Sequence, residues 1–237
     1  MSNTYFQFKQ FTIHQEKAAL KVCTDACIFG AWVAQRMPFT GRVLDIGAGT
    51  GLLMMMLAQQ TDLYVDGIEI DPDSFQQATA NIQANPWKER LQVLQGDVKT
   101  FSFQHTYDGI ITNPPFFEND LISNQQKEQV AKHSTALTLE DLIAAIQNNL
   151  TPEGQFAILL PYHRHDYFTK LAFEFGYHLN EQVWVKQHEK KSDYFRTISI
   201  YSRSAKKYEP DFLSIRNDQN EYTPAFTALL KDYYLHL

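Results

Sequence analysis

Cysteine is scarce in this chain of 237 residues: it has two, Cys23 and Cys27, and no second pair for them to join. The sequence therefore contains neither a disulfide framework nor the thiols of a four-ligand zinc site. Its eight histidines show no spacing that is typical of metal ligands. We expect no metal centre.

Long apolar runs are also missing. The longest clear one, residues 52–58, is far shorter than the roughly 20 residues of a membrane helix. The first residues show no export signal, which predicts a cytoplasmic protein without a membrane partner. Without repeats or linkers, residues 1–237 are expected to form one domain and a monomer. We divide it into a lid-like segment with a helix (1–40), a core (41–203) and a tail with a helix (204–237).

Positive charge is in the minority, because 21 Lys and Arg side chains stand against 27 Asp and Glu side chains, a formal net charge of −6. This balance argues against a nonspecific nucleic-acid coat. Residues 186–207 are an exception, with only Glu189 and Asp193 as acids. We call their basic side chains the basic island: Lys186, Lys190, Lys191, Arg196, Arg203, Lys206 and Lys207.

What the sequence does contain is a regular alternation of β-branched runs and helical patterns. It predicts strands at residues 42–46, 64–70, 91–94, 107–112 and 155–160, and helices at 52–60, 73–84, 139–150 and 165–175. Two more strands, at 181–185 and 196–201, have no helix between them and are expected to pair antiparallel. The predicted fold is α/β: a Rossmann-like, doubly wound, mostly parallel seven-stranded sheet with a C-terminal antiparallel strand pair.

Both ends of the chain are expected to add smaller elements. Alternating aromatic residues between positions 6 and 13 predict a short hairpin or lid. Thr24 is expected to be the N-cap of a helix over residues 24–35. Residues 204–237 are predicted to begin as a loop and to end in a helix introduced by Thr223 and Pro224.

The strongest motif is VLDIGAGTG at residues 43–51, in which Gly47, Gly49 and Gly51 separate a predicted strand from a predicted helix. Closely spaced glycines permit a tight turn and a close approach to a ligand, and the helix start offers unpaired amides. The spacing G-x-G-x-G differs from the G-x-G-x-x-G of dinucleotide dehydrogenases, which disfavours a nicotinamide cofactor.

Acids follow the next two strands at the same edge of the sheet. Glu69 ends the second strand, where doubly wound folds place an acid that binds ribose hydroxyls. Asp97 follows the third strand and can accept a hydrogen bond from an adenine amine. These acids and the glycine turn predict a site for an adenosine-bearing ligand. Asp45, within the first strand, must find hydrogen-bond donors once it is buried.

Asn113, Pro114, Pro115 and Phe116 form an NPPF tetrad directly after the fourth strand. The prolines fix the backbone and remove two amide donors, so the tetrad is rich in acceptors. The carbonyls of Asn113 and Pro114 can accept both hydrogens of one amino group, and an aromatic ring can stack on the base that carries it. Such contacts direct the nitrogen lone pair at an electrophile without a strong base.

Taken in order, VLDIGAGTG, the acid of IEID, Gly96-Asp97 and NPPF resemble class I S-adenosylmethionine-dependent methyltransferases that methylate amines. The resemblance covers residues 20–203. Within it, KVCTDACIFGAW at residues 21–32 looks like the matching segment of bacterial tRNA(Val) adenosine-N6 methyltransferases, which modify a purine beside the anticodon. The resemblance implies S-adenosylmethionine as the cofactor and N6 of an adenine in tRNA as the methyl acceptor.

The resemblance also implies roles for individual residues. The glycines and Asp45 would surround the methionine part of the cofactor, Glu69 would bind ribose and Asp97 adenine, Thr24 and Asp25 would close over the cofactor, and the tetrad would hold the target amine. The residues assigned to the cofactor are Thr24, Asp25, Asp45, Gly47, Gly49, Gly51, Glu69, Asp97 and Asn113. Next to such a site, the basic island predicts RNA contacts from Lys186, Lys190, Lys191, Arg196 and Arg203.

Other functions stay open at this point. The same tetrad suits an rRNA guanine-N2 methyltransferase or a protein glutamine-N5 methyltransferase, although the latter usually carries a helical substrate domain before the glycine turn. From a different class, a noncatalytic RNA-binding protein would retain the fold and the basic island.

Overall fold

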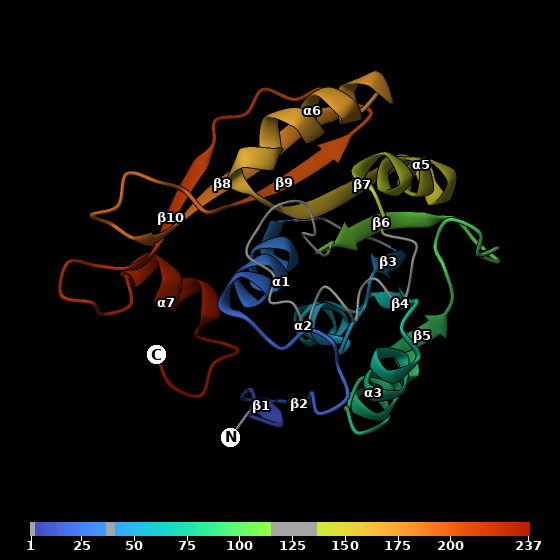
Figure 1. Ribbon diagram of the computed structural model, residues 1–237, viewed down its shortest axis with the longest axis horizontal. Coiled ribbons are helices and arrows are strands. Elements are labelled where there is room, and N and C mark those ends of the chain that lie inside the picture. Colours follow the sequence, from blue (N-terminus) through green and yellow to red (C-terminus); the bar gives the residue numbers. More distant parts are fainter. Residues whose placement is uncertain (1–2, 37–40, 115–136) are drawn as a thin grey trace, which may run out of the picture.

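The structure is a computed structural model that describes residues 3–36, 41–114 and 137–237 (Figure 1). Its centre is an eight-stranded sheet with the strand order β10-β8-β9-β7-β6-β3-β4-β5. Five strands run parallel: β3 (Arg42–Ile46), β4 (Tyr64–Glu69), β5 (Leu91–Gln95), β6 (Tyr107–Thr112) and β7 (Leu150–Pro161). Beyond β7 lie β9 (Arg196–Ser202), which is antiparallel to both of its neighbours, β8 (His178–His188), and β10 (Asp211–Arg216), which is parallel to β8.

Helices cover both faces of this sheet. They are α1 (Thr24–Arg36), α2 (Leu52–Gln60), α3 (Pro72–Gln83), α5 (Leu139–Asn149), α6 (His165–Glu174) and α7 (Pro224–Leu230), with short 3-10 turns at η1 (Lys88–Arg90) and η2 (Tyr162–Arg164). One buried cluster contains residues of α1, α2 and α7, and the other contains residues of α5 and α6. Successive strand residues belong to different clusters, as Val43 and Leu44 do, because side chains alternate across a sheet.

The α/β doubly wound fold and the antiparallel pair β8–β9 confirm the prediction, but the count of seven strands is wrong. The eighth strand, β10, lies in the segment that was expected to be a loop. Its alternation is short and flanked by charge: Leu213 and Ile215 are buried, whereas Phe212 is exposed. The predicted N-cap is also wrong by one position: α1 begins at Thr24, so Thr24 is the first helical residue and not the N-cap.

Local sequence signals explain where several helices begin. Asp71 caps α3 by accepting a hydrogen bond from the Ser74 amide, and Pro72 follows at the first helical position. Thr138 and Asp141 form a reciprocal capping box at α5. Thr223 caps α7 in the same way, by accepting from the Phe226 amide.

The N-terminal aromatic segment forms the expected hairpin. Its strands β1 (Tyr5–Gln7) and β2 (Thr12–His14) pair antiparallel in a separate small sheet. A bridge between Phe8 and Tyr234 ties this hairpin to the C-terminal residues. Within the described ranges, no helix has the length and apolar character needed to span a membrane.

Candidate active site

The carboxyl ends of four parallel strands bring the predicted cofactor residues to one edge of the sheet, which we call the carboxyl edge. Ile46, before the glycine turn, pairs with Ile68 of β4 and with Thr112 of β6. Glu69 pairs with Gln95 of β5. The glycine turn, Glu69, the segment after β5 and Asn113 are therefore adjacent, as the sequence predicted. Binding sites of doubly wound folds lie at this edge.

The glycine turn has a backbone that favours glycine. Gly47 and Gly51 have φ values of 79° and 81°, in the left-handed region. A Cβ atom built on Gly47 would have no heavy atom within 4 Å apart from those of Gly47 and its chain neighbours, so the turn borders open space there. The amides of Gly47 and Ala48 do not point into that space, since they donate to the Ile68 carbonyl over 3.0 and 3.1 Å. The turn therefore leaves space for a ligand, but these two amides are not available as hydrogen-bond donors to it.

Glu69 is fixed by the same turn. Its carboxylate accepts hydrogen bonds from the amides of Gly49 (2.8 Å) and Asp71 (2.9 Å), and the residue is buried. Burial raises the pKa of Glu69, and the two amide hydrogen bonds partly oppose this. Two amides leave further lone pairs on the carboxylate for ribose hydroxyls. The acid is therefore preorganised for the predicted role.

Asp45 is fully buried, and neither of its carboxylate oxygens has a hydrogen-bond partner in the described part of the chain. Burial, with a contribution from the Glu69 charge, raises its pKa to about 8. A buried acid without donors is costly. A cationic or hydrogen-bond-donating ligand group at the turn would supply what Asp45 lacks, and the ammonium group of a bound methionine moiety has this chemistry. The residues present fit the implied cofactor.

Asp97 and Asn113 complete the edge. One carboxylate oxygen of Asp97 accepts from the Lys99 amide at 3.0 Å, and the other lies 3.9 Å from the Lys99 ammonium. Asn113 is half-buried and directly follows Thr112, whose hydroxyl holds the end of β6 to the Ile46 carbonyl at 3.0 Å. Pro114 is buried. Pro115 and Phe116 lie outside the described residues, so their predicted roles stay predictions.

Asp25, expected to close over the cofactor, forms an ion pair that the sequence did not reveal. The guanidinium of Arg196 lies 2.7 Å from its carboxylate. This contact joins the first turn of α1 to the first residue of β9 at the carboxyl edge. Thr24 precedes Asp25 in the same turn. Arg196, predicted to contact RNA, thus also holds a candidate cofactor residue.

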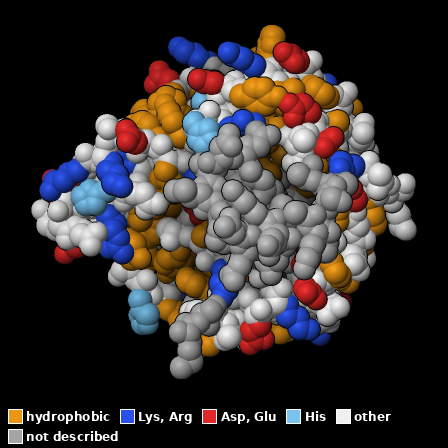
Figure 2. Space-filling view, viewed as in Figure 1, with side chains coloured by type: hydrophobic (Ala, Val, Ile, Leu, Met, Phe, Trp, Pro, Cys, Tyr) orange, Lys and Arg blue, Asp and Glu red, His pale blue; other side chains and the backbone are white. Residues whose placement is uncertain are grey.

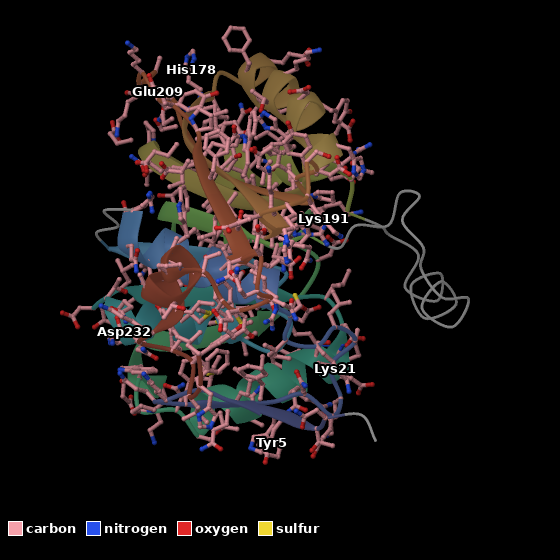
Figure 3. The ribbon with its side chains drawn as sticks, turned by 90° about the vertical axis from the view of Figure 1, so that its left-hand side faces the viewer. Tyr5, Lys21, His178, Lys191, Glu209 and Asp232 are labelled. Atoms are coloured by element: carbon pink, nitrogen blue, oxygen red, sulfur yellow. The ribbon has the colours of Figure 1, made fainter. Side chains whose placement is uncertain are left out.

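The sheet register divides the basic island between two ends of the molecule. Lys186 lies near the end of β8, and Lys190 and Lys191 follow in the β8–β9 connection at the carboxyl edge. Arg203 follows the last residue of β9 at the opposite edge, where it lies over the Tyr177 ring. Figure 3 shows Lys191 far from His178, the first residue of β8. No group of three or more potential metal ligands occurs among the described residues.

Asn81 is a residue that sequence reasoning missed. Its buried side chain donates to the carbonyls of His14 (2.8 Å) and Thr50 (3.0 Å) and accepts from the His14 amide. It thereby ties the N-terminal hairpin to the glycine turn. Nothing in the local sequence distinguishes Asn81 from an exposed helical asparagine, because its partners lie far away in the chain.

Comparisons with known proteins decide the family. Residues 31–183 match the family model of the methyltransferase small domain. A protein of Dyadobacter fermentans is 40% identical over 98% of this chain and 98% of its own length, and one of Tolumonas auensis is 36% identical over 100% and 99%. Both are named tRNA1(Val) (adenine(37)-N6)-methyltransferase. The chain belongs to this methyltransferase family.

The predicted resemblance is therefore confirmed, and the chain is an enzyme of the methyltransferase class. A solved structure from Agrobacterium tumefaciens, described as a predicted O-methyltransferase, has the same fold. It superposes with a TM-score of 0.66 at 17% identity and covers 88% of this chain and 96% of its own. This likeness supports the fold and nothing finer.

Proposed function

We propose that this enzyme methylates the N6 amine of adenosine 37 in tRNA1(Val), with S-adenosylmethionine as the methyl donor. The single observation that carries the proposal is full-length similarity to relatives with that name, at 40% identity for one of them. The adjacency of the glycine turn, Glu69 and Asn113 at the carboxyl edge supports it. We further propose that it acts as a cytoplasmic monomer without a metal.

The chain's own residues would bind and orient both reactants. Asp45 and the glycine turn would hold the amino-acid part of the donor, Glu69 its ribose hydroxyls and Asp97 its adenine. Thr24 and Asp25 would close the donor site, with Arg196 holding Asp25 in place.

Asn113 and the tetrad would orient the acceptor. The Asn113 carbonyl and the Pro114 carbonyl accept the two hydrogens of the amine, which directs its lone pair away from the ring plane. When bound, S-adenosylmethionine would supply an electrophilic methyl group to the nitrogen that these two carbonyls orient. The methylated nitrogen would then release one proton to solvent, which needs no strong base on the protein.

Two variants test these roles separately. Asn113→Ala should lower kcat by about 100-fold or more, because it removes an acceptor aimed at the amine, and should weaken cofactor binding less than Glu69→Ala does. Glu69→Ala should weaken cofactor binding in calorimetry. The methylated tRNA is digested to nucleosides and analysed by mass spectrometry. Full activity of Asn113→Ala would contradict the role of the tetrad, and methyl groups on guanine or protein would contradict the proposed substrate.

A further inference from the structure

Four aromatic side chains meet on the α6 side of the sheet, near the carboxyl edge. We call Tyr162, Trp184, Tyr194 and Phe212 the aromatic cluster. The Trp184 ring centroid lies 5.3 Å from Tyr162, 5.2 Å from Tyr194 and 5.6 Å from Phe212. The indole N–H of Trp184 donates to Gln182 over 2.6 Å, which fixes the ring. The cluster is therefore a built surface and not a set of independent rings.

This cluster is accessible to solvent. Phe212 is 61% exposed, and Tyr162, Trp184 and Tyr194 are half-buried. Exposed rings that already contact one another mark interaction sites more often than isolated apolar side chains do. Because the rings hold one another in place, a partner that stacks on them immobilises few additional side chains.

Positive charge adjoins the cluster. The Lys186 ammonium lies 4.7 Å from the centroid of Tyr194. Lys190 and Lys191 lie in the β8–β9 connection, as Tyr194 does. The Lys190 ammonium pairs with Asp218 at 3.6 Å, whereas Lys191 has no acid partner among the described residues. In Figure 2, Lys and Arg side chains gather with a histidine on the projection at the left, beside apolar side chains. Rings beside cations are the chemistry that recognises unpaired nucleotides.

The register places this surface on the side where the reaction is proposed. Thr112, just before the tetrad, is level with Ile158, Ser199 and Gln182 on successive strands. Trp184 and Lys186 lie farther along β8 in the same direction, beyond the level at which β6 ends. An RNA loop whose target base enters the carboxyl edge would therefore pass the aromatic cluster with its neighbouring nucleotides.

We propose that the aromatic cluster is a stacking platform for unpaired bases of the RNA substrate, with Lys186 and Lys191 contacting their phosphates. The inference rests on the proposed function and specifies how its substrate is held. Stacking on aromatic rings tolerates any base, so the platform would strengthen binding to the loop without reading its sequence.

The test uses Phe212, because its exposure allows substitution without loss of the core. Phe212→Leu keeps an apolar side chain but removes the ring, and Phe212→Tyr keeps the ring. The control is Phe173→Leu, since Phe173 is 64% exposed and its ring lies against that of His178 at the opposite edge. Binding of an RNA hairpin with the anticodon loop of tRNA1(Val) is measured by fluorescence anisotropy at fixed salt.

We expect Phe212→Leu to weaken hairpin binding about fivefold or more, and Phe212→Tyr and Phe173→Leu to stay within about twofold. Unchanged binding by Phe212→Leu would overturn the inference, and so would equal weakening by Phe212→Leu and Phe212→Tyr. Loss of self-association in sedimentation, with RNA binding unchanged, would overturn it in favour of a contact between copies of the chain.

The same experiment separates this inference from the proposed function. Wild-type enzyme that methylates adenosine 37 while Phe212→Leu binds normally would refute the platform alone. Wild-type enzyme that binds the hairpin through Phe212 but methylates no adenosine would refute the proposed reaction and leave the platform standing.

Discussion

At the scale of single residues, Asp45 makes stability depend on pH. Its pKa is about 8 in the fold and about 3.9 in an unfolded chain. Between these values the native state holds a proton that the unfolded state has lost, so the free energy of unfolding falls as pH rises. The limiting slope is about 1.4 kcal/mol per pH unit. Denaturation of the cofactor-free protein at several pH values between about 5 and 8 measures it.

Asp45→Asn has no titrating group at this position and should show a flatter profile than the wild type. Asp62→Asn, at an exposed acid, serves as the matched control and should keep the wild-type slope. Equal pH slopes of the unfolding free energy for the wild type and Asp45→Asn would contradict the raised pKa of Asp45. They would mean that Asp45 is ionised in the fold and has hydrogen-bond donors of its own.

Asn81 carries a second prediction at this scale, because three hydrogen bonds converge on one buried amide. Asn81→Ala leaves the two carbonyls of His14 and Thr50 without their donor and should lower the free energy of unfolding by about 2–3 kcal/mol. Asn81→Asp loses the same donors and should be at least as destabilising. Gln76→Ala, which removes one exposed contact to Lys17, should change stability by less than about 0.5 kcal/mol. Chemical denaturation compares the three, and equal values would contradict the anchoring role.

At the scale of elements, the ion pair between Arg196 and Asp25 couples β9 to α1. Both side chains are largely buried, with 25% and 14% of their surfaces exposed. A double-mutant cycle with Arg196→Ala and Asp25→Ala should give a coupling energy of roughly 0.5–3 kcal/mol in unfolding. Cofactor affinity should fall with each single variant. If Arg196→Ala weakened RNA binding with cofactor affinity intact, its role would be the one predicted from sequence.

The helices and strands show how much of the fold can be predicted from the sequence. The periodicity of apolar residues and the positions of glycines predict the bounds of α2, β3 and β6, and these bounds match the structure residue for residue. The strand β10 does not follow, because its short alternation lies between charged residues and gains its stability from pairing with β8. Tertiary pairing overrides such a weak local pattern.

The candidate site divides in the same way. Its motifs place Gly47, Glu69 and Asn113 at one edge because parallel strands end together. The partner of Asp25, the contacts of Asn81 and the missing donors of Asp45 depend on residues distant in the chain. These contacts became visible only in the folded structure.

At the scale of the whole molecule, a chain with a negative net charge needs a locally positive surface at the place where it binds RNA. The net charge is −6, yet Lys186 and Lys191 adjoin the carboxyl edge, whereas Lys207 lines a surface pocket together with Glu181 and Asp211. Each lysine that contacts a phosphate releases counterions when RNA binds, so it adds to the salt dependence of binding. Position relative to the edge, and not total charge, should decide which lysine contributes.

Lys191→Ala should therefore reduce the slope of log K against log salt concentration by about 0.7 to 1, uniformly across RNA sequences. Lys207→Ala removes the same charge from the acid-flanked pocket and should leave the slope unchanged. Lys190→Ala should have a smaller effect than Lys191→Ala, because its ammonium is already paired with Asp218. Anisotropy titrations at four or more salt concentrations give the slopes. Equal slopes for Lys191→Ala and Lys207→Ala would mean that RNA binding depends on the overall charge of the molecule. This result would contradict the inference that RNA binds at the carboxyl edge.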